Sequence, residues 1–128
     1  MAGEIVTRTR RFYIGADGIL RSIMLPGDEE TLADAEENVR ASVGLSNGRR
    51  YPVLADGRQT RSVDRAARLH YAGPELTATI LAMAVVVASP VQRVIANFFL
   101  RLHKPPYPCR LFTVEAEALA WLQGFMQR

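Results

Sequence analysis

The chain has 128 residues, of which 48% are hydrophobic and 23% are charged, and its formal net charge is +3. These values are typical of one globular domain spanning residues 1–128, which is large enough to bury a core without disulfides or metals. The single cysteine, Cys109, excludes an internal disulfide, no apolar run is long enough to span a membrane, and the N-terminus lacks the pattern of a secretion signal. We therefore expect a cytoplasmic protein.

The N-terminal third predicts a β-hairpin. We expect residues 1–7 to form a flexible N-terminus. Two apolar segments, 11–14 and 19–25, then flank a turn that contains Asp17 and Gly18. Both turn residues tolerate the positive φ that a tight hairpin turn requires, so the segments are expected to pair as antiparallel strands.

The middle of the chain predicts helices alternating with strands. Hydrophobic spacing indicates a helix over about 30–43, which Gly44 would end as a left-handed cap. A short strand is expected at 51–55, and Ser62 is expected to be the N-cap of the next helix. The valine-rich segment 82–88 is then predicted to be a buried strand, because β-branched side chains favour strands.

Ser89 and Pro90 are the clearest helix start in the chain, because they combine an N-cap oxygen with proline at the first helical position. Helical spacing places five apolar residues on one stripe, and we expect that stripe to be buried. Its burial would contribute about 10 kcal/mol before conformational entropy, at about 2 kcal/mol for each side chain. The stripe consists of Val91, Val94, Ile95, Phe98 and Leu102.

The C-terminal part predicts a last strand at 109–112, followed by a helix that Thr113 would cap. Four residues are expected to bind this final helix to the sheet, namely Ala116, Leu119, Ala120 and Leu122. An apolar strand that leads straight into a helix indicates a sheet covered on its faces. The order of elements therefore predicts an α/β fold.

This order and several short motifs resemble the STAS-like fold, which is shared by the anti-anti-sigma factors of sporulation and the lipid-transfer (CRAL-TRIO) domains. The closing RLFTVEAEALAWL resembles the usual STAS ending. More narrowly, RSVDRAAR, GPE, SPVQRVIANFF and KPPYP resemble a small, uncharacterised bacterial STAS-like family. The resemblance covers about residues 5–125. It implies an α/β (α+β) fold with an N-terminal hairpin, alternating helices and strands, and one mixed sheet covered by helices, but it assigns no reaction.

The resemblance also suggests a phosphoswitch or anion site. In sporulation-type STAS proteins, a phosphorylatable serine begins the helix after the third strand, in a D-S-[S/T]-G-like motif. Ser62, or Thr60 as a second choice, occupies this place here, although the aspartate and the glycine of the motif are absent. A phosphate on Ser62 would be neutralised by Arg58, Arg61 or Arg65. The alternative is that Ser62 only caps its helix.

A second candidate is an interaction surface around the proline-rich segment 103–108, whose prolines reduce the entropy lost on binding. The alternative is a rigid connector in which Tyr107 packs on the core. Phe98 and Phe99 are adjacent and cannot face one direction, so burial of Phe98 would leave Phe99 exposed for a subunit or ligand contact. The candidate interaction residues are Phe99, His103, Pro106 and Tyr107.

No set of residues predicts catalysis, a metal site or a cofactor site. His70 and His103 lack partners at metal-ligand spacing, and Cys109 reads as a small core residue beside a strand. We therefore expect a protein that is not an enzyme and that needs no cofactor.

Three functions are compatible with these observations. The first is a regulatory interaction module that binds a protein partner or itself as a homodimer. The second is a carrier of a small apolar ligand or lipid. The third is nucleic-acid binding through segment 49–68, which holds six arginines and two aspartates, but the low net charge argues against it.

Overall fold

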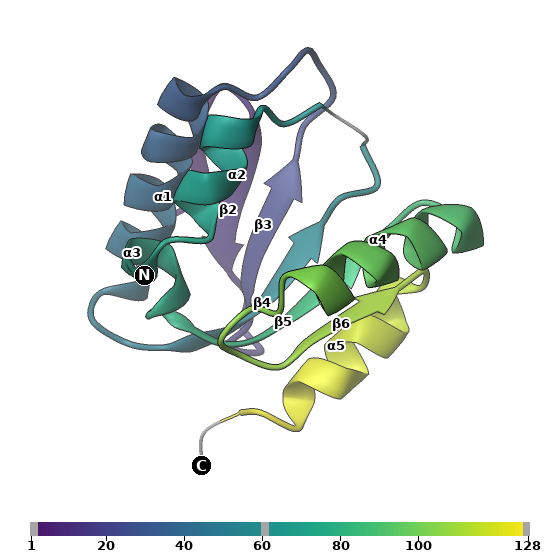
Figure 1. Ribbon diagram of the computed structural model, residues 1–128. Coiled ribbons are helices and arrows are strands. Elements are labelled where there is room, and N and C mark those ends of the chain that lie inside the picture. Colours follow the sequence, from purple (N-terminus) through teal and green to yellow (C-terminus); the bar gives the residue numbers. More distant parts are fainter. Residues whose placement is uncertain (1–2, 60–61, 127–128) are drawn as a thin grey trace.

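The computed structural model describes residues 3–59 and 62–126. These residues form a six-stranded sheet whose strands follow one another in space in the order of the chain (Figure 1). The strands are β1 (Ile5–Val6), β2 (Arg10–Ile14), β3 (Leu20–Met24), β4 (Tyr51–Asp56), β5 (Ile80–Val86) and β6 (Cys109–Phe112).

The sheet is mixed. Strands β1, β2 and β3 are antiparallel neighbours, whereas β3, β4, β5 and β6 run parallel. The predicted hairpin is present: Gly18 has a φ of 78° and the Asp17 carboxylate accepts a hydrogen bond from the Ile19 amide. Within the segment expected to be a flexible N-terminus, Ile5 pairs with Phe12 as part of β1.

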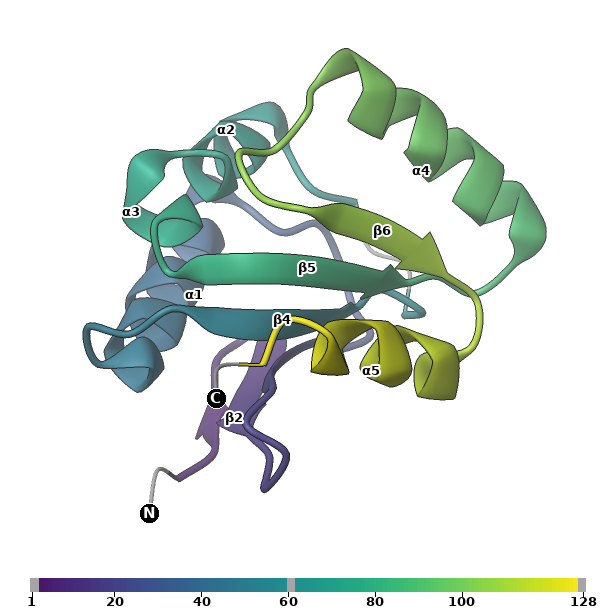
Figure 2. The same ribbon diagram turned by 90° about the horizontal axis from the view of Figure 1, so that it is seen from below.

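Helices cover both faces of this sheet. The parallel connections carry α1 (Leu32–Ser46), α2 (Arg65–Tyr71), α3 (Pro74–Thr77) and α4 (Pro90–Leu102), and α5 (Glu115–Gln123) closes the chain. Successive right-handed crossovers that run in one direction place their helices on the same face, whereas α5 lies on the opposite face (Figures 1 and 2). Helix α4 differs from the others because it stands away from the middle of the sheet, near β6 (Figure 2).

The two faces are covered to different extents. Strand β5 alternates between buried and half-buried residues. Ala82, Ala84 and Val86 face α5 and are fully buried, whereas Met83 and Val85 on the other face are only half-buried. The predicted inner strand is therefore confirmed, but the covering helices close one face more completely than the other. The α5-side core contains Ile19, Leu54, Ala82, Ala84, Val86, Phe112, Ala118 and Leu122.

Helix α1 continues to Ser46, three residues beyond its expected end at residue 43, so the prediction that Gly44 caps it is wrong. Leu45 and Ser46 are buried, and their burial offsets the cost of an internal glycine, which is about 1 kcal/mol. Asn47 takes the left-handed cap conformation instead, with a φ of 48°. Asparagine is one of the few residues other than glycine that tolerates it.

Two other predicted caps are also wrong. Asp64 caps α2, because its carboxylate accepts a hydrogen bond of 2.8 Å from the Ala67 amide. Ser62 lies two residues earlier, outside the helix, and its carbonyl accepts a hydrogen bond from the Glu30 amide. At the last helix, Val114 rather than Thr113 is the cap residue, and no side chain caps it.

Candidate docking surface

Helix α4 begins where the sequence predicts. The Ser89 hydroxyl accepts a hydrogen bond from the Gln92 amide at 3.2 Å, and Pro90 occupies the first helical position. The Gln92 side chain returns the interaction by accepting from the Ala88 amide at 3.0 Å. These bonds satisfy amides that a helix start leaves unpaired, so the helix has a well-defined first turn.

The apolar stripe of α4 is exposed, so the prediction that it is buried is wrong. Each member of the stripe exposes between 53% and 69% of its surface. The adjacent Phe99 is 57% exposed and its ring contacts that of Phe98 edge to face, with centroids 5.9 Å apart. We call these six residues the α4 ridge: Val91, Val94, Ile95, Phe98, Phe99 and Leu102.

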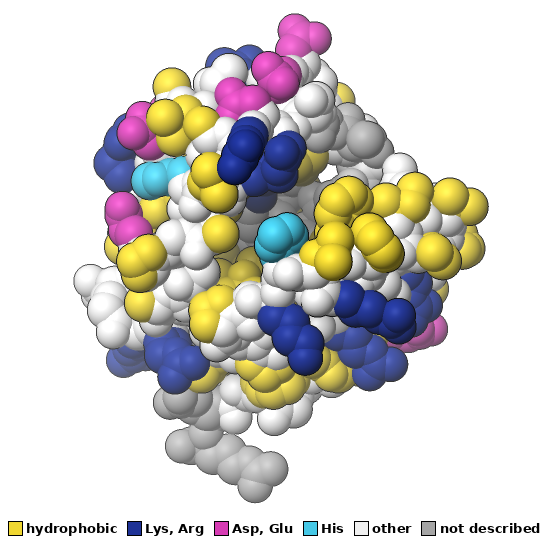
Figure 3. All heavy atoms as spheres, viewed as in Figure 1, with side chains coloured by type: hydrophobic (Ala, Val, Ile, Leu, Met, Phe, Trp, Pro, Cys, Tyr) yellow, Lys and Arg dark blue, Asp and Glu magenta, His cyan; other side chains and the backbone are white. Residues whose placement is uncertain are grey.

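The orientation of α4 explains the exposure. Ala96 and Leu100 are half-buried and lie on the opposite side of the helix from most of the ridge. Figure 2 shows α4 near the edge of the sheet, beside β6. This position leaves its apolar stripe exposed to solvent rather than packed on the middle of the sheet. Figure 3 shows hydrophobic side chains gathered along α4, beside a hollow that separates it from α2.

A hollow of about 330 Å³ lies beside the ridge, and Ile95 and Phe99 form one of its walls. Met24 and Val87 come from the ends of β3 and β5 and form the other. The complete lining is mostly apolar: Met24, Gly57, Val87, Gln92, Ile95, Ala96 and Phe99.

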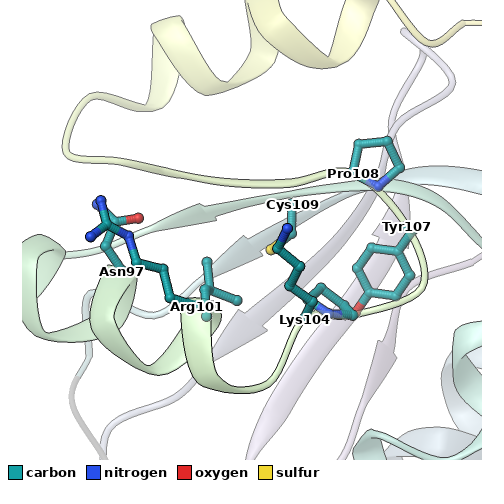
Figure 4. Close-up of a pocket in the computed structure, with 8 residues that line it drawn as sticks. Asn97, Arg101, Lys104, Tyr107, Pro108 and Cys109 are labelled. Atoms are coloured by element: carbon teal, nitrogen blue, oxygen red, sulfur yellow. The ribbon is translucent and has the colours of Figure 1, made fainter.

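A second hollow, of about 320 Å³, lies where α4 meets the following loop. Its lining includes Arg101, Lys104 and Tyr107. In Figure 4, Arg101 and Asn97 project side by side from α4, and Lys104 extends toward Cys109. This hollow therefore combines positive side chains with the edge of the sheet.

The loop after α4 divides the predicted interaction residues. His103 and Pro106 are exposed, whereas Tyr107 is half-buried and packs, with Met83, against the second core cluster, which lies on the α1 side of the sheet and consists of Phe12, Leu20, Leu45, Val53 and Ile80. Burial raises the pKa of Tyr107 to about 12 and that of Cys109 to about 11. The Cys109 thiol is therefore protonated at neutral pH, which disfavours a nucleophilic role.

The predicted anion site has a different environment from the one expected. The Ser62 hydroxyl lies 3.4 Å from a carboxylate oxygen of Glu29. Arg58 points elsewhere, because it contacts Asp56 and Glu115, each at 2.7 Å. A phosphate on Ser62 would therefore face a carboxylate.

The other residues predicted for that site give no evidence of an anion site. Arg65 is exposed at the start of α2, and Thr60 and Arg61 lie outside the described residues. Other arginines of segment 49–68 bind backbone at separate places: Arg50 donates to the Ile80 carbonyl and Arg68 to the Val63 carbonyl.

A buried polar cluster joins the hairpin to α1 and α2. Arg10 forms two hydrogen bonds with the Glu30 carboxylate, of 2.9 and 3.0 Å, and Thr9 donates a third of 2.6 Å. The Asn38 amide lies 3.0 Å from the same carboxylate, and the Arg10 guanidinium stacks on the Tyr71 ring. Burial opposes ionisation of Glu30, but the hydrogen bonds from Arg10 and Thr9 outweigh it, and its pKa is lowered.

This cluster is saturated. Within residues 3–59 and 62–126, no buried side-chain nitrogen or oxygen lacks a hydrogen-bond partner. Over the same residues, no group of three His, Cys, Asp or Glu side chains is placed to hold a metal ion. The polar cluster therefore stabilises the fold and leaves no atom directed at a ligand.

The chain segment that carries the α4 ridge contains basic residues but no acidic ones. The sequence contains no Asp or Glu from residue 76 to residue 114. Four basic side chains lie in this segment, Arg93, Arg101, Lys104 and Arg110, and none forms an ion pair within the described part of the chain. The long acid-free segment is the signal that could have singled out this surface from the sequence.

A family model matches residues 12–126 of this chain, and its description is a domain of unknown function, DUF7793. The chain belongs to the DUF7793 family. No curated protein matches it significantly. In the described residues, no helix combines the length and hydropathy that crossing a bilayer requires.

Two solved structures are similar to this DUF7793 domain. One is an uncharacterised DUF3478-family protein from Shewanella loihica PV-4 with a SpoIIAA-like fold; it has 14% identity and a TM-score of 0.64, over 94% of this chain and 90% of that one. The other, a protein of unknown function from Arthrobacter sp. FB24, has 39% identity and a TM-score of 0.35, over 87% of this chain and 96% of that one. The first confirms the predicted STAS-like, SpoIIAA-like fold.

Proposed function

We propose that this domain is a non-enzymatic interaction module and that the α4 ridge is its docking surface. The observation that carries the proposal is that six large apolar side chains on one helix each expose more than half of their surface. Single exposed apolar residues are common, but a contiguous apolar patch on a folded domain is typical of an interaction site.

The energetics favour a partner. Covering a large apolar side chain contributes about 2 kcal/mol, so the ridge offers a substantial driving force that the isolated domain does not use. The Ser89 cap and Pro90 hold the helix in shape before binding, which reduces the entropy lost on association. The sequence favours a protein as partner, either another chain or a second copy, and a regulatory role in the cytoplasm.

Site-specific photo-crosslinking in cells that produce the protein tests this function. One variant carries the photoreactive analogue benzoylphenylalanine in place of Phe98. The control carries it in place of Leu69, which is 61% exposed on α2. We expect adducts from position 98 that are absent from position 69. Equal adducts from both positions, or none from either, would refute docking of a protein partner on the ridge.

Self-association is the simplest form of protein docking, and it is tested by measuring the oligomeric state of the purified chain. If a second copy covers the ridge, sedimentation equilibrium of the purified chain shows a dimer, and Phe98→Asp or Phe99→Asp shifts it to monomer. The matched Leu69→Asp variant should leave the equilibrium unchanged, because Leu69 lies on a different helix.

A second candidate function is carriage of a small apolar ligand, and the hollow between α4 and the ends of β3 and β5 favours it. Its volume of about 330 Å³ lies at the lower end of the range for ligand sites. Native mass spectrometry of freshly purified protein checks this function. A co-purifying mass that Phe99→Asp removes would support carriage, and the bare chain mass alone would refute it.

A further inference from the structure

Cationic side chains border the α4 ridge. Arg93, Asn97 and Arg101 are spaced four residues apart and form a polar stripe along the same helix. Lys104 follows in the loop after α4, where it lines the same hollow as Arg101 (Figure 4). The helix therefore presents an apolar face and, next to it, a positively charged one.

The acidic side chains lie elsewhere on the molecule. In Figure 3, most Asp and Glu side chains in view lie over α1 and the loops near it, whereas the surroundings of α4 show mainly Lys and Arg, with acidic atoms visible only at the right edge below the helix. Because segment 76–114, which includes α4 and the loop after it, contains no Asp or Glu, a negatively charged surface can approach the helix without meeting carboxylates of that segment.

We infer that α4 is a membrane-surface anchor, which lays its apolar ridge among the acyl chains of an anionic lipid surface and places its cations against the phosphates. This inference rests on the proposed function, because it names the partner of the same ridge. An exposed helix with large apolar residues on one face and Arg or Lys on the polar face is the type that binds at a lipid interface. Each cation near an anionic surface strengthens the attachment.

Charge decides between the lipid surface and a second copy of this chain. A two-fold contact between two ridges brings the same surface of each copy together. Arg93, Arg101 and Lys104 of both copies would then gather around one interface, and segment 76–114 has no carboxylate to neutralise them. An anionic lipid surface removes this repulsion and supplies the phosphates that the cations lack.

Vesicle co-sedimentation of the full chain tests the inference. One set of vesicles contains phosphatidylcholine alone, and the other contains phosphatidylcholine mixed with phosphatidylglycerol. We expect binding to the mixed vesicles at low salt, weaker binding at high salt because ions screen the attraction, and little binding to phosphatidylcholine alone.

Variants separate the two faces of the helix. Phe98→Asp should abolish binding, and each of Arg101→Gln and Lys104→Gln should weaken it about fivefold. Leu69→Asp and Arg40→Gln are the matched controls, since both residues are exposed on other helices and should bind like the unchanged chain. Circular dichroism of every variant establishes that it is folded.

The outcomes distinguish this inference from the proposed function. Absence of binding, or equal binding to both vesicle types, overturns the lipid inference. If crosslinks at position 98 then join proteins, or if Phe98→Asp dissolves a dimer, docking through the ridge stands with a protein partner. If position 98 yields neither lipid binding nor adducts, both proposals fall.

Discussion

Basic side chains have different surroundings at the two ends of the sheet. In the α1 half, arginines are paired with carboxylates: Arg8 with Asp34, Arg10 with Glu30 and Arg21 with Asp17. In the α4 half, the basic side chains have no acid in their own segment, and the apolar side chains beside them are exposed. The α1 half pairs these arginines within the fold, whereas the α4 half leaves its basic side chains without an ion pair and its apolar ridge exposed, within the described residues.

This contrast indicates which residues stabilise the fold and which are available for binding. In the Arg10–Glu30 pair, Glu30 is fully buried and Arg10 mostly so, and the buried atoms are hydrogen-bonded, so loss of the pair should damage folding. The α4 ridge contributes little buried surface, so changes in it should leave folding intact and affect association. The following expectations, ordered from the largest effect to the smallest, test that division.

The largest effect should come from breaking the buried ion pair. Glu30→Ala leaves the Arg10 guanidinium buried without its counter-ion, which should lower the free energy of unfolding by about 3–5 kcal/mol. Urea denaturation measures the change. The double variant Arg10→Met with Glu30→Leu should lose less than Glu30→Ala, because it removes both charges. A single-variant loss below about 1 kcal/mol would show that the pair is not essential.

Two phenylalanines provide a matched comparison of the halves. Phe112 is 5% exposed and contacts Trp121, with ring centroids 5.9 Å apart, whereas Phe98 is 60% exposed. Phe112→Ala should cost about 3–5 kcal/mol of unfolding free energy, and Phe98→Ala should change it by less than about 0.5 kcal/mol. Similar losses from the two substitutions would mean that the ridge is part of the core.

Acid should destabilise the α1 half. The hydrogen bonds from Arg8 lower the pKa of Asp34, and those from Arg10 and Thr9 lower that of Glu30 despite its burial. The unfolded chain therefore binds more protons than the folded one in the acid range. The stabilisation is complete above the ordinary carboxyl pKa, which is about 4, and is lost as the pH falls through the lower folded values.

Thermal unfolding at a series of acid pH values measures this dependence. The unchanged chain should lose stability more steeply than Glu30→Gln, which cannot titrate at that position. Parallel curves for the two proteins would contradict the assignment of the acid response to Glu30.

The smallest effect concerns the start of α2. Asp64→Ala removes the cap hydrogen bond to the Ala67 amide and should cost about 1 kcal/mol. Ser62→Ala should change stability by less than about 0.5 kcal/mol, because the side chain is exposed and, among the described residues, its hydroxyl makes one long hydrogen bond, to Glu29. The reverse order in urea denaturation would restore Ser62 as the cap.

Most of the fold was predictable because local signals agreed. The Asp17-Gly18 turn, the Ser89-Pro90 helix start and the valine-rich strand all form as expected. Cap positions were less predictable, since Ser62, Asp64, Gly44 and Asn47 offer competing caps within a few residues. Which one is used depends on how far the buried contacts extend each helix.

The site was only partly predictable. Phe99 is exposed, but the sequence predicted this only as a consequence of burial of Phe98, and Phe98 is exposed as well. Exposure of the rest of the ridge was not predicted. A periodic apolar stripe looks the same whether it meets the chain's own sheet or a partner. The position of α4 relative to the sheet separates those two cases.

The amino-acid sequence by itself determined the types and order of the elements, because hydrophobic period, turn residues and proline act over a few residues. Only the tertiary structure decided what each surface meets. Burial depends on how closely elements far apart in the chain pack together. Here α5 packs on the sheet and buries the core beneath it, whereas the apolar face of α4 stays exposed to solvent.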